Sequence, residues 1–211
     1  MTATSNPTAL EIVEGVDLTG KTIVITGASS GLGRESARAL AATGARVILA
    51  ARNVAALADT EEWVRDQVPG AVLSRVHLDL TSLESVGAAA AEIAELTPAV
   101  HVLMNNAGVM FTPFGRTTDG FEIQFGTNHL GHFELTRLLF PALVAADGAR
   151  VVVLSSEGHR MSDVDLDDPN WERREYDKFA AYGASKTANV LHAVELDRRF
   201  RDAGVRAYAV H

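Results

Sequence analysis

Short apolar runs alternate along this chain with longer stretches rich in Ala, Leu, Glu and Arg. The apolar runs are mostly β-branched, which is typical of strands that are buried on both faces of a sheet. They predict strands at residues 22–26, 46–51, 72–80, 100–106, 150–156 and 205–211. The stretches between them predict helices near residues 32–43, 53–67, 82–96, 119–146 and 183–203.

This alternation predicts an α/β fold, because strand–helix–strand units place parallel strands in one sheet through right-handed crossovers. We expect residues 1–211 to form one domain, a doubly wound, Rossmann-like parallel sheet with helices on both faces. Sheets of this kind bind ligands at the carboxyl ends of their strands. Residues 1–17 precede the pattern as an N-terminal extension. Residues 157–181 interrupt it as a polar, acidic insertion loop, which is either a mobile surface excursion or part of a substrate site.

Composition narrows the class of protein. Of 211 residues, 47% are hydrophobic and 22% are charged, which is typical of a soluble globular protein. A net charge of −8 disfavours nucleic acid as a partner, and the lack of cysteine excludes disulfides and thiolate chemistry. The first 15 residues do not resemble a signal peptide, and no apolar run approaches the ~20 residues of a membrane span. We therefore predict a cytoplasmic protein without membrane association.

A glycine-rich turn follows the first predicted strand and precedes a helix. It reads G-A-S-S-G-L-G over residues 27–33. Its glycines permit a tight turn close to a pyrophosphate, and the helix that follows offers free N–H groups and the positive end of its dipole. The spacing differs from the G-x-G-x-x-G fingerprint, so a tight turn without a ligand is the alternative. The residues predicted to hold the dinucleotide here are Gly27, Ser29, Ser30, Gly31, Leu32, Gly33 and Arg34.

The end of the second strand indicates which dinucleotide is bound. It reads L-A-A-R-N, without Asp or Glu. In doubly wound folds an acidic residue at this place binds the ribose of NAD, whereas Arg accommodates the 2′-phosphate of NADP. We predict NADP(H) in preference to NAD(H), with Arg52 at the phosphate. The alternative is that Arg52 is a solvated surface charge.

Tyr182 and Lys186 lie four residues apart in Y-G-A-S-K, at the start of the last predicted helix. Positions four apart share a helix face, and a cation near a phenol favours the phenolate. Tyr182 is therefore a candidate general acid or base. Ser155 and Ser156 end the fifth strand, where a hydroxyl can stabilise developing charge on a carbonyl oxygen. The alternative for Tyr182 and Lys186 is an ordinary exposed helix start. The alternative for the two serines is simple capping of a helix or loop.

Together and in this order, the motifs resemble the short-chain dehydrogenase/reductase family from about residue 18 to the chain end. T-G-A-S-S-G-L-G at residues 26–33 resembles the family's cofactor loop. Asn128, in T-N-H-L-G-H, resembles its catalytic asparagine. Further residues resemble the segment that contacts adenine and the fourth-strand signature N-N-A-G, namely Asp79, Leu80, Asn106, Ala107 and Gly108.

The resemblance implies an oxidoreductase that moves a hydride between a nicotinamide and a small carbonyl or alcohol substrate. Tyr182 would exchange a proton with the substrate oxygen, and Lys186 would hold the nicotinamide ribose and assist Tyr182. Ser156 would orient the carbonyl, and Asn128 would hold a water that passes protons to Lys186. The nicotinamide carries the hydride chemistry, and the protein supplies position and electrostatics.

The long spacing between Ser156 and Tyr182, with N-H-L-G-H-F and Y-G-A-S-K-T-A-N, resembles one branch of the family. That branch contains retinol dehydrogenases, WW-domain oxidoreductase and protochlorophyllide reductase. The family resemblance also implies a homodimer or homotetramer, paired through the helices at residues 119–146 and 183–203. No metal is expected, because His129, His132 and His159 have no carboxylate at metal-site spacing.

The chain ends at V-R-A-Y-A-V-H, where family members usually continue with Pro-Gly, a substrate-binding lid and a seventh strand. We therefore expect a sheet truncated after the sixth strand, as a piece of a longer protein. Two functions compete for that protein, an active oxidoreductase and a catalytically silent NADP(H)-binding module that acts through partners. The presence of Asn128, Ser156, Tyr182 and Lys186 favours the enzyme.

Overall fold

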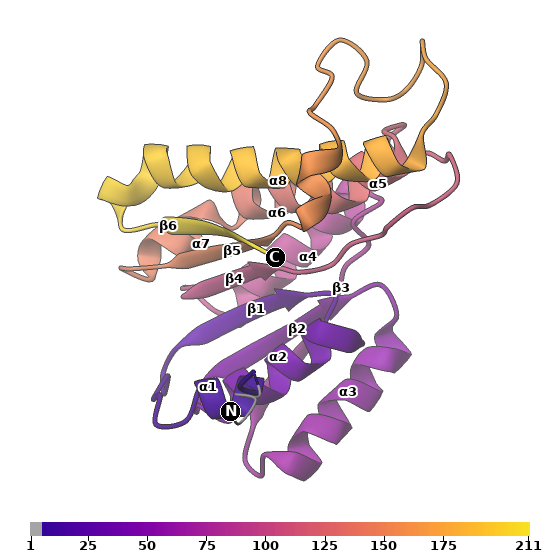
Figure 1. The fold of residues 1–211 in the computed structure, drawn as a ribbon. Helices are drawn as coiled ribbons and strands as arrows, with labels where there is room; N and C mark the ends of the chain where they lie inside the picture. Colours follow the sequence, from indigo (N-terminus) through magenta and orange to yellow (C-terminus); the bar gives the residue numbers. More distant parts are fainter. Residues whose placement is uncertain (1–5) are drawn as a thin grey trace, which may run out of the picture.

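Six parallel strands form one twisted sheet in the computed structural model, which describes residues 6–211 (Figure 1). They are β1 (Thr22–Thr26), β2 (Arg46–Ala51), β3 (Val72–His77), β4 (Val102–Asn105), β5 (Arg150–Leu154) and β6 (Arg206–Val210). The strand order is β3-β2-β1-β4-β5-β6, so the winding reverses between the neighbours β1 and β4. Such a reversal is where open α/β sheets bind their ligands. The predicted doubly wound fold is confirmed.

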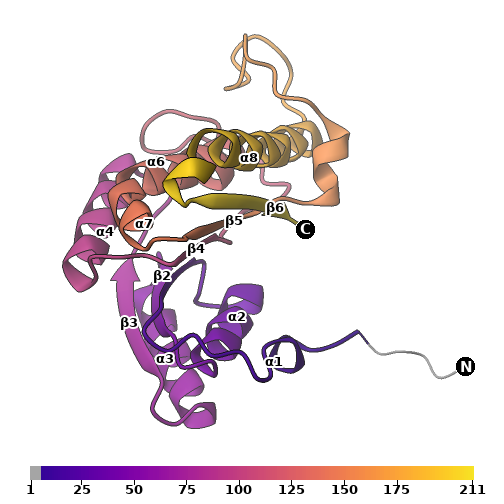
Figure 2. The same ribbon diagram turned by 90° about the vertical axis from the view of Figure 1, so that its left-hand side faces the viewer.

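Helices cover both faces of the sheet (Figures 1 and 2). Alternate strand residues point to opposite faces, so Ile23 and Ile25 belong to one buried cluster and Val24 to the other. One cluster packs under α2 (Gly31–Ala41) and α3 (Val54–Gln67). The other packs under α4 (Leu83–Leu96), α6 (Gly131–Leu138), α7 (Phe140–Ala145) and α8 (Lys178–Phe200).

The prediction of a single helix at residues 119–146 is wrong, because this segment contains several shorter elements. It holds α5 (Ile123–Phe125), the π-helical turn η1 (Gly126–Leu130), α6 and α7. Gly126 packs so tightly that a Cβ there would lie 2.3 Å from the Thr117 side chain. Pro141 has no N–H to continue α6, and it lies in the first turn of α7 instead.

Helix α8 begins five residues earlier than the sequence pattern predicts. The Asp177 carboxylate accepts hydrogen bonds from the main-chain N–H groups of Phe179 and Ala180, which fixes the helix start at Lys178. Tyr182 therefore lies in the second turn of α8. Strands β3 and β4 also end earlier than predicted, so Asp79 and Asn106 lie in the loops that follow them.

The predicted insertion, residues 157–181, holds the 3-10 helix η2 (Glu157–Met161), an arm that projects from the body in Figure 1, and the start of α8. Trp171 is buried within the arm, and the Arg174 guanidinium stacks on its ring at 3.8 Å. The Asp168 carboxylate accepts hydrogen bonds from the main chain of Glu172 and Arg173. These contacts give the arm a defined structure.

The predicted N-terminal extension, residues 1–17, lies partly outside the described residues. Its described part contains α1 (Ala9–Ile12), which Thr8 and Glu11 close with a capping box. Between residues 6 and 211, no helix is both long enough and apolar enough to span a bilayer.

Candidate active site

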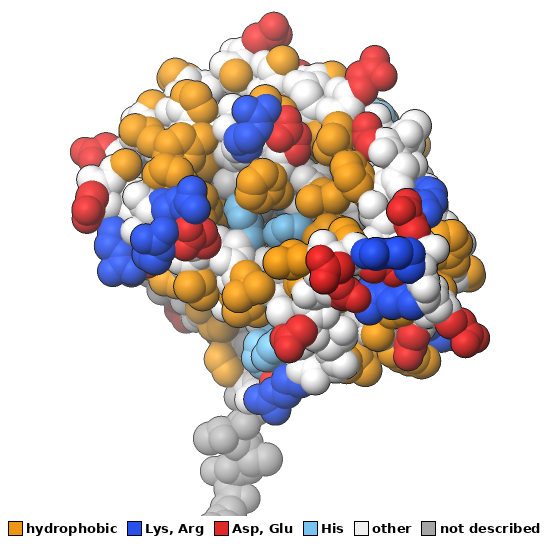
Figure 3. All heavy atoms as spheres, turned by 90° about the horizontal axis from the view of Figure 1, so that it is seen from above, with side chains coloured by type: hydrophobic (Ala, Val, Ile, Leu, Met, Phe, Trp, Pro, Cys, Tyr) orange, Lys and Arg blue, Asp and Glu red, His pale blue; other side chains and the backbone are white. Residues whose placement is uncertain are grey.

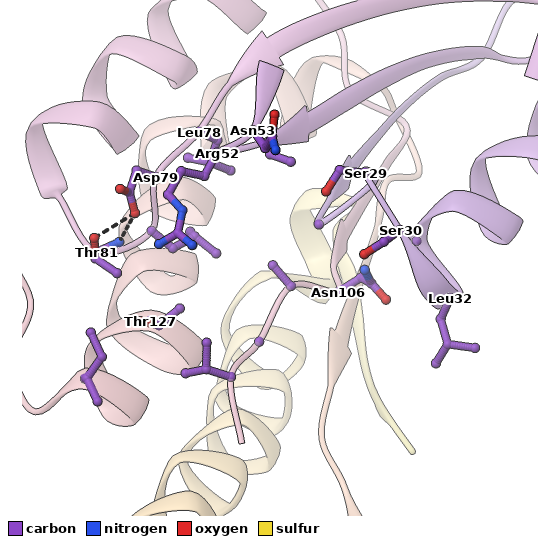
Figure 4. A pocket seen from close by; sticks show the side chains of 18 residues that line it. Ser29, Ser30, Leu32, Arg52, Asn53, Leu78, Asp79, Thr81, Asn106 and Thr127 are labelled. Atoms are coloured by element: carbon purple, nitrogen blue, oxygen red, sulfur yellow. Dashed lines mark hydrogen bonds between the residues drawn. The ribbon is translucent and has the colours of Figure 1, made fainter. Parts of the chain in front are cut away.

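A cavity of about 590 Å³ opens at the carboxyl ends of β1 to β4 (Figure 4). Its volume falls within the roughly 300–1,000 Å³ of typical ligand pockets. It lies at the reversal of the sheet, where the sequence predicts the dinucleotide. The residues predicted to bind the cofactor that line it are Gly27, Ser29, Ser30, Leu32, Gly33, Arg52, Asp79, Leu80, Asn106, Ala107 and Gly108.

The glycines of the loop meet different steric requirements. Gly27 has a φ of +68°, and a Cβ there would lie 2.9 Å from the Cα of Ala107. A Cβ on Gly33 would lie 2.3 Å from the Gly27 carbonyl oxygen, so α2 can approach β1 only through glycine. Gly31 has open space around it but a φ of +55°, which side chains rarely adopt. The loop therefore presents bare main chain and the start of α2 to the cavity, which fits a pyrophosphate.

Thr26, the last residue of β1, stabilises one wall of this cavity through hydrogen bonds. Its hydroxyl oxygen accepts hydrogen bonds from the main-chain N–H groups of Asn106 at 2.9 Å and Ala107 at 3.0 Å. The Asn106 side chain returns a bond to the Thr26 carbonyl oxygen at 2.8 Å. In the sequence, Thr26 stands out only as the first residue of T-G-A-S-S-G-L-G. Its role depends on the neighbouring strand β4, which lies far away along the chain.

The two arginines predicted beside the cofactor lie in different environments. Arg52 is exposed, and its side chain projects from the end of β2 into the cavity in Figure 4. The Arg34 guanidinium instead stacks on the ring of Trp63 at 4.1 Å, and Arg34 does not line the cavity. Beside Arg52, in the loop after β3, the Asp79 carboxylate accepts two hydrogen bonds from Thr81, drawn as dashed lines in Figure 4.

Asn128 lies fully buried in the π-helical turn η1, a kind of irregularity that is frequent at functional sites. Its side-chain amide donates to the carbonyl oxygen of Val109 at 2.9 Å and to the Ser185 hydroxyl at 3.0 Å. Its amide oxygen accepts from the Val109 N–H at 2.8 Å. Asn128 thereby joins the segment after N-N-A-G to helix α8.

Lys186 is 5% exposed, and its ammonium donates to the carbonyl oxygen of Leu154 at 3.0 Å. Burial disfavours the charged form and lowers the pKa of Lys186 from 10.5 to about 8. A Cβ on Gly108 would lie 3.6 Å from the Lys186 ammonium and 3.1 Å from the Asn128 amide oxygen. Because Gly108 also lines the cavity, the predicted cofactor site and these two residues adjoin.

Tyr182 and Ser156 both lie next to Gly158. A Cβ on Gly158 would lie 2.7 Å from the Tyr182 ring and 3.3 Å from the Ser156 hydroxyl oxygen. The Lys186 ammonium lies 5.7 Å from the centre of the Tyr182 ring. The buried Ser155 hydroxyl turns away and donates to the Lys186 carbonyl oxygen. The structure thus brings Ser156, rather than Ser155, beside Tyr182.

A buried polar cluster that the sequence analysis missed holds the insertion in place. The Tyr176 hydroxyl donates to the fully buried Glu122 carboxylate and accepts from the Gln124 side chain, each at 2.9 Å. Burial raises the pKa of Tyr176. Gln124 also accepts from the Phe111 N–H, and the Phe111 ring packs edge-on against Tyr182 at 5.2 Å. No sequence pattern links these residues, because 52 positions separate Gln124 from Tyr176.

A second cavity, of about 390 Å³, lies between α6, α7 and α8. Seen from above, hydrophobic side chains surround a hollow in which histidines are visible (Figure 3). His192 lines this cavity and packs against Phe133 at 5.3 Å and His129 at 5.9 Å. Burial lowers the pKa of His192 to about 4. In the described part of the chain, no three His, Asp or Glu side chains group together as ligands for a metal ion.

Comparison with known proteins identifies the family. Residues 21–211 match the family model described as short chain dehydrogenase. Human retinol dehydrogenase 13 is 44% identical over 192 residues, which cover 91% of this chain and 58% of that protein. Human WW domain-containing oxidoreductase is 40% identical over 211 residues, 97% of this chain and 51% of that protein. The chain thus spans little more than half the length of these curated relatives.

Solved structures share the fold. An uncharacterized protein from Mycobacterium paratuberculosis is 41% identical with a TM-score of 0.81, over 97% of this chain and 71% of that one. A metagenomic short-chain oxidoreductase in complex with NADP is 27% identical with a TM-score of 0.74, over 91% and 81% of the two chains. A Burkholderia phymatum relative in complex with NAD is 30% identical with a TM-score of 0.71, over 92% and 65%. The chain therefore belongs to the short-chain dehydrogenase/reductase family of oxidoreductases, and retinol dehydrogenases and WW domain-containing oxidoreductase are among its relatives.

Proposed function

We propose that this protein is an NADP(H)-dependent oxidoreductase that interconverts a carbonyl and an alcohol. One observation carries the proposal: Gly108 lines the dinucleotide-sized cavity and lies against both Asn128 and Lys186. A nicotinamide at that end of the cavity would adjoin the proton-transfer groups. When bound, the nicotinamide supplies the hydride, and the chain's residues supply the proton and the geometry.

The four predicted catalytic residues divide the remaining work. Tyr182 donates a proton to the carbonyl oxygen during reduction and removes one from the alcohol during oxidation. Lys186 places a buried cation near the phenol, and Ser156 donates a hydrogen bond to the same substrate oxygen. Asn128 is held by Val109 and Ser185, so it keeps a fixed position next to Lys186, where we propose that it holds a water for proton transfer.

The proposed preference for NADP(H) rests on Arg52, which projects into the cavity where an acidic residue would favour NAD. Two of the comparison structures contain a cofactor, NADP in one and NAD in the other, so a nicotinamide dinucleotide is common to these two. Arg34 would reach the same ligand only by leaving Trp63. We therefore assign the 2′-phosphate to Arg52.

The decisive experiment uses the full-length protein and follows NADPH absorbance with a panel of aldehydes and ketones. We expect oxidation of NADPH by the wild type, and a loss of kcat of about 10²–10⁴-fold in Tyr182→Phe with an unchanged Kd for NADPH. Tyr208→Phe, which alters an exposed tyrosine on β6, is the matched control. A wild type that binds NADPH but oxidises none would instead support the silent module.

The homo-oligomer also stays a proposal, and exposed apolar side chains on α6 and α8 support it. Leu191 and Val194 are 58% and 60% exposed on one face of α8, and Phe133 on α6 is 45% exposed where it packs against His192 of α8. Sedimentation equilibrium of wild type and Leu191→Glu tests it, since a charge on a shared face should favour the monomer. The cytoplasmic location remains a prediction from the sequence.

A further inference from the structure

His132 is a buried polar residue in α6 that the proposed mechanism does not use. It is 1% exposed, and its ring lies between the end of β1 and the π-helical turn η1. Its Nε2 is 2.8 Å from the Thr26 hydroxyl oxygen, and its Nδ1 is 2.9 Å from the main-chain carbonyl oxygen of Asn128. Both neighbours belong to the candidate active site.

The hydrogen-bond partners determine the protonation of the His132 ring. Burial lowers the pKa of His132 to about 3, so the ring is neutral and carries a single N–H. A carbonyl oxygen can only accept, so the proton must be on Nδ1 and point at Asn128. Nε2 is then an acceptor.

The same reasoning orients the Thr26 hydroxyl. Its oxygen already accepts from the main-chain N–H groups of Asn106 and Ala107, so its one proton is free to be donated. His132 Nε2 is at 2.8 Å, whereas the alternative acceptor, the carbonyl oxygen of Met104, is at 3.4 Å. Thr26 therefore donates to His132, and His132 donates to the carbonyl oxygen of Asn128. The two hydrogen bonds thus run in the same direction, from Thr26 to Asn128.

We propose that His132 is a positioning residue that couples the wall of the dinucleotide cavity to Asn128, donating to Asn128 and accepting from Thr26. On the cavity side, Thr26 holds Asn106 and Ala107 in place. On the other side, Asn128 holds Val109 and Ser185 beside Lys186. The consequence for turnover rests on the function proposed above, whereas the consequence for dinucleotide binding does not.

Two substitutions separate the halves of this coupling. His132→Asn keeps an N–H donor near the place of Nδ1 but removes the acceptor for the Thr26 hydroxyl. His132→Gln places its amide near Nε2 and leaves the Asn128 carbonyl oxygen without its partner. We expect His132→Asn to raise the Kd for NADPH about tenfold with kcat less affected, and His132→Gln to lower kcat about tenfold with Kd less affected.

His192→Asn and His192→Gln are the matched controls, because His192 is also a neutral histidine, half-buried on α8, and it does not line the dinucleotide cavity. They should shift neither constant. Equal losses of binding and turnover in both His132 variants, or no loss in either, would overturn the proposal. A histidine that only fills the core would lower Tm in both variants without this opposite pattern.

The tautomer is measured in the cofactor-free protein, so it is independent of catalysis. In ¹³C,¹⁵N-labelled wild-type protein, sequential assignment identifies the His132 ring signals without either variant. We expect the neutral Nδ1–H form to persist down to about pH 5, given a pKa of about 3. An Nε2–H form would refute the assignment even if both variants unfold. Failure of the wild type to oxidise NADPH would refute the proposed function and leave this test in force.

Discussion

Lys186 donates a hydrogen bond from its ammonium group to the main-chain carbonyl oxygen of Leu154 at 3.0 Å. Leu154 is the last residue of β5, so this bond holds a cation at the carboxyl end of the sheet, directly before the two serines. The surrounding protein removes most of the water that would stabilise the charge, and the pKa of Lys186 falls to about 8. Lys186 therefore releases its proton more readily near neutral pH than an exposed lysine. The burial of its charge lowers the free energy of unfolding.

Stability should rise with pH between about 8 and 10.5 because of this lysine. Below pH 8, Lys186 is protonated in both the folded and the unfolded state, and the cost of burying the charge is present in full. Above it, the folded protein releases the proton first, so the unfolded state binds more protons and the free energy of unfolding increases. The shift from 10.5 to about 8 corresponds to about 3 kcal/mol. Urea unfolding of wild type and Lys186→Met from about pH 7 to about pH 11 should show this gain in the wild type alone.

Lys178→Met is the control for that measurement. Lys178 is exposed in the first turn of the same helix, so its removal should leave the pH dependence of unfolding as in the wild type. If the wild type and Lys186→Met showed parallel curves over this range, the ammonium would be solvated and the geometry around Leu154 would be incorrect.

The fold and most of the cavity lining could be predicted from local sequence. β-branched runs specify strands, and the glycine loop falls between β1 and α2 because its φ values and close contacts demand glycine at fixed positions. The sequence predicts one helix over residues 119–146 because apolar positions continue through the π-helical turn η1 and through the break between α6 and α7. The π-helical turn depends on the packing of Gly126 against Thr117, which is a contact between separate segments.

Side-chain directions could not be predicted in the same way. Arg34 lies next to the glycine loop in sequence, but the ring of Trp63 on α3 attracts its guanidinium away from the cavity. The bonds from Tyr176 to Glu122 and Gln124 form only once the insertion packs on the body. These contacts join positions far apart along the chain, so no local pattern indicates them.

Gly33→Ala should destabilise the protein and weaken NADPH binding. The added Cβ would lie 2.3 Å from the Gly27 carbonyl oxygen, so the main chain of the loop would have to move. Such overpacking typically costs about 1–3 kcal/mol. Gly87→Ala is the control, because Gly87 lies inside α4 with open space around it and should gain up to about 1 kcal/mol. Urea unfolding of both variants distinguishes these opposite signs, and two losses of equal size would contradict the packing described for the loop.

Arg52→Ala should reduce the affinity for NADPH about tenfold and leave the affinity for NADH within about twofold. The expected loss is at the low end for a charged hydrogen bond, because Arg52 is exposed and water screens its charge. Binding titrations with both cofactors measure the ratio. Arg137→Ala, which removes an exposed arginine from α6, should change neither value. An NADPH-to-NADH ratio that Arg52→Ala leaves unchanged would show that this side chain is only a surface charge.

Tyr176→Phe should loosen the insertion more than it destabilises the whole domain. The substitution keeps the ring against Trp171 and Phe114 but removes the hydroxyl that donates to Glu122 and accepts from Gln124. Both partners keep other hydrogen bonds, so we expect a loss of about 1–2 kcal/mol in the free energy of unfolding.

Limited proteolysis measures the local effect, because a loosened insertion would be cleaved faster between residues 162 and 177. Tyr208→Phe is the control, since Tyr208 is 42% exposed on β6 and its hydroxyl can be hydrated by solvent. Because Gln124 also bonds to Phe111, which packs against Tyr182, looser anchoring should raise KM for the carbonyl substrate more than it lowers kcat. Cleavage at the wild-type rate, with unchanged KM, would mean that the Glu122–Gln124–Tyr176 cluster does not hold the insertion against the active site.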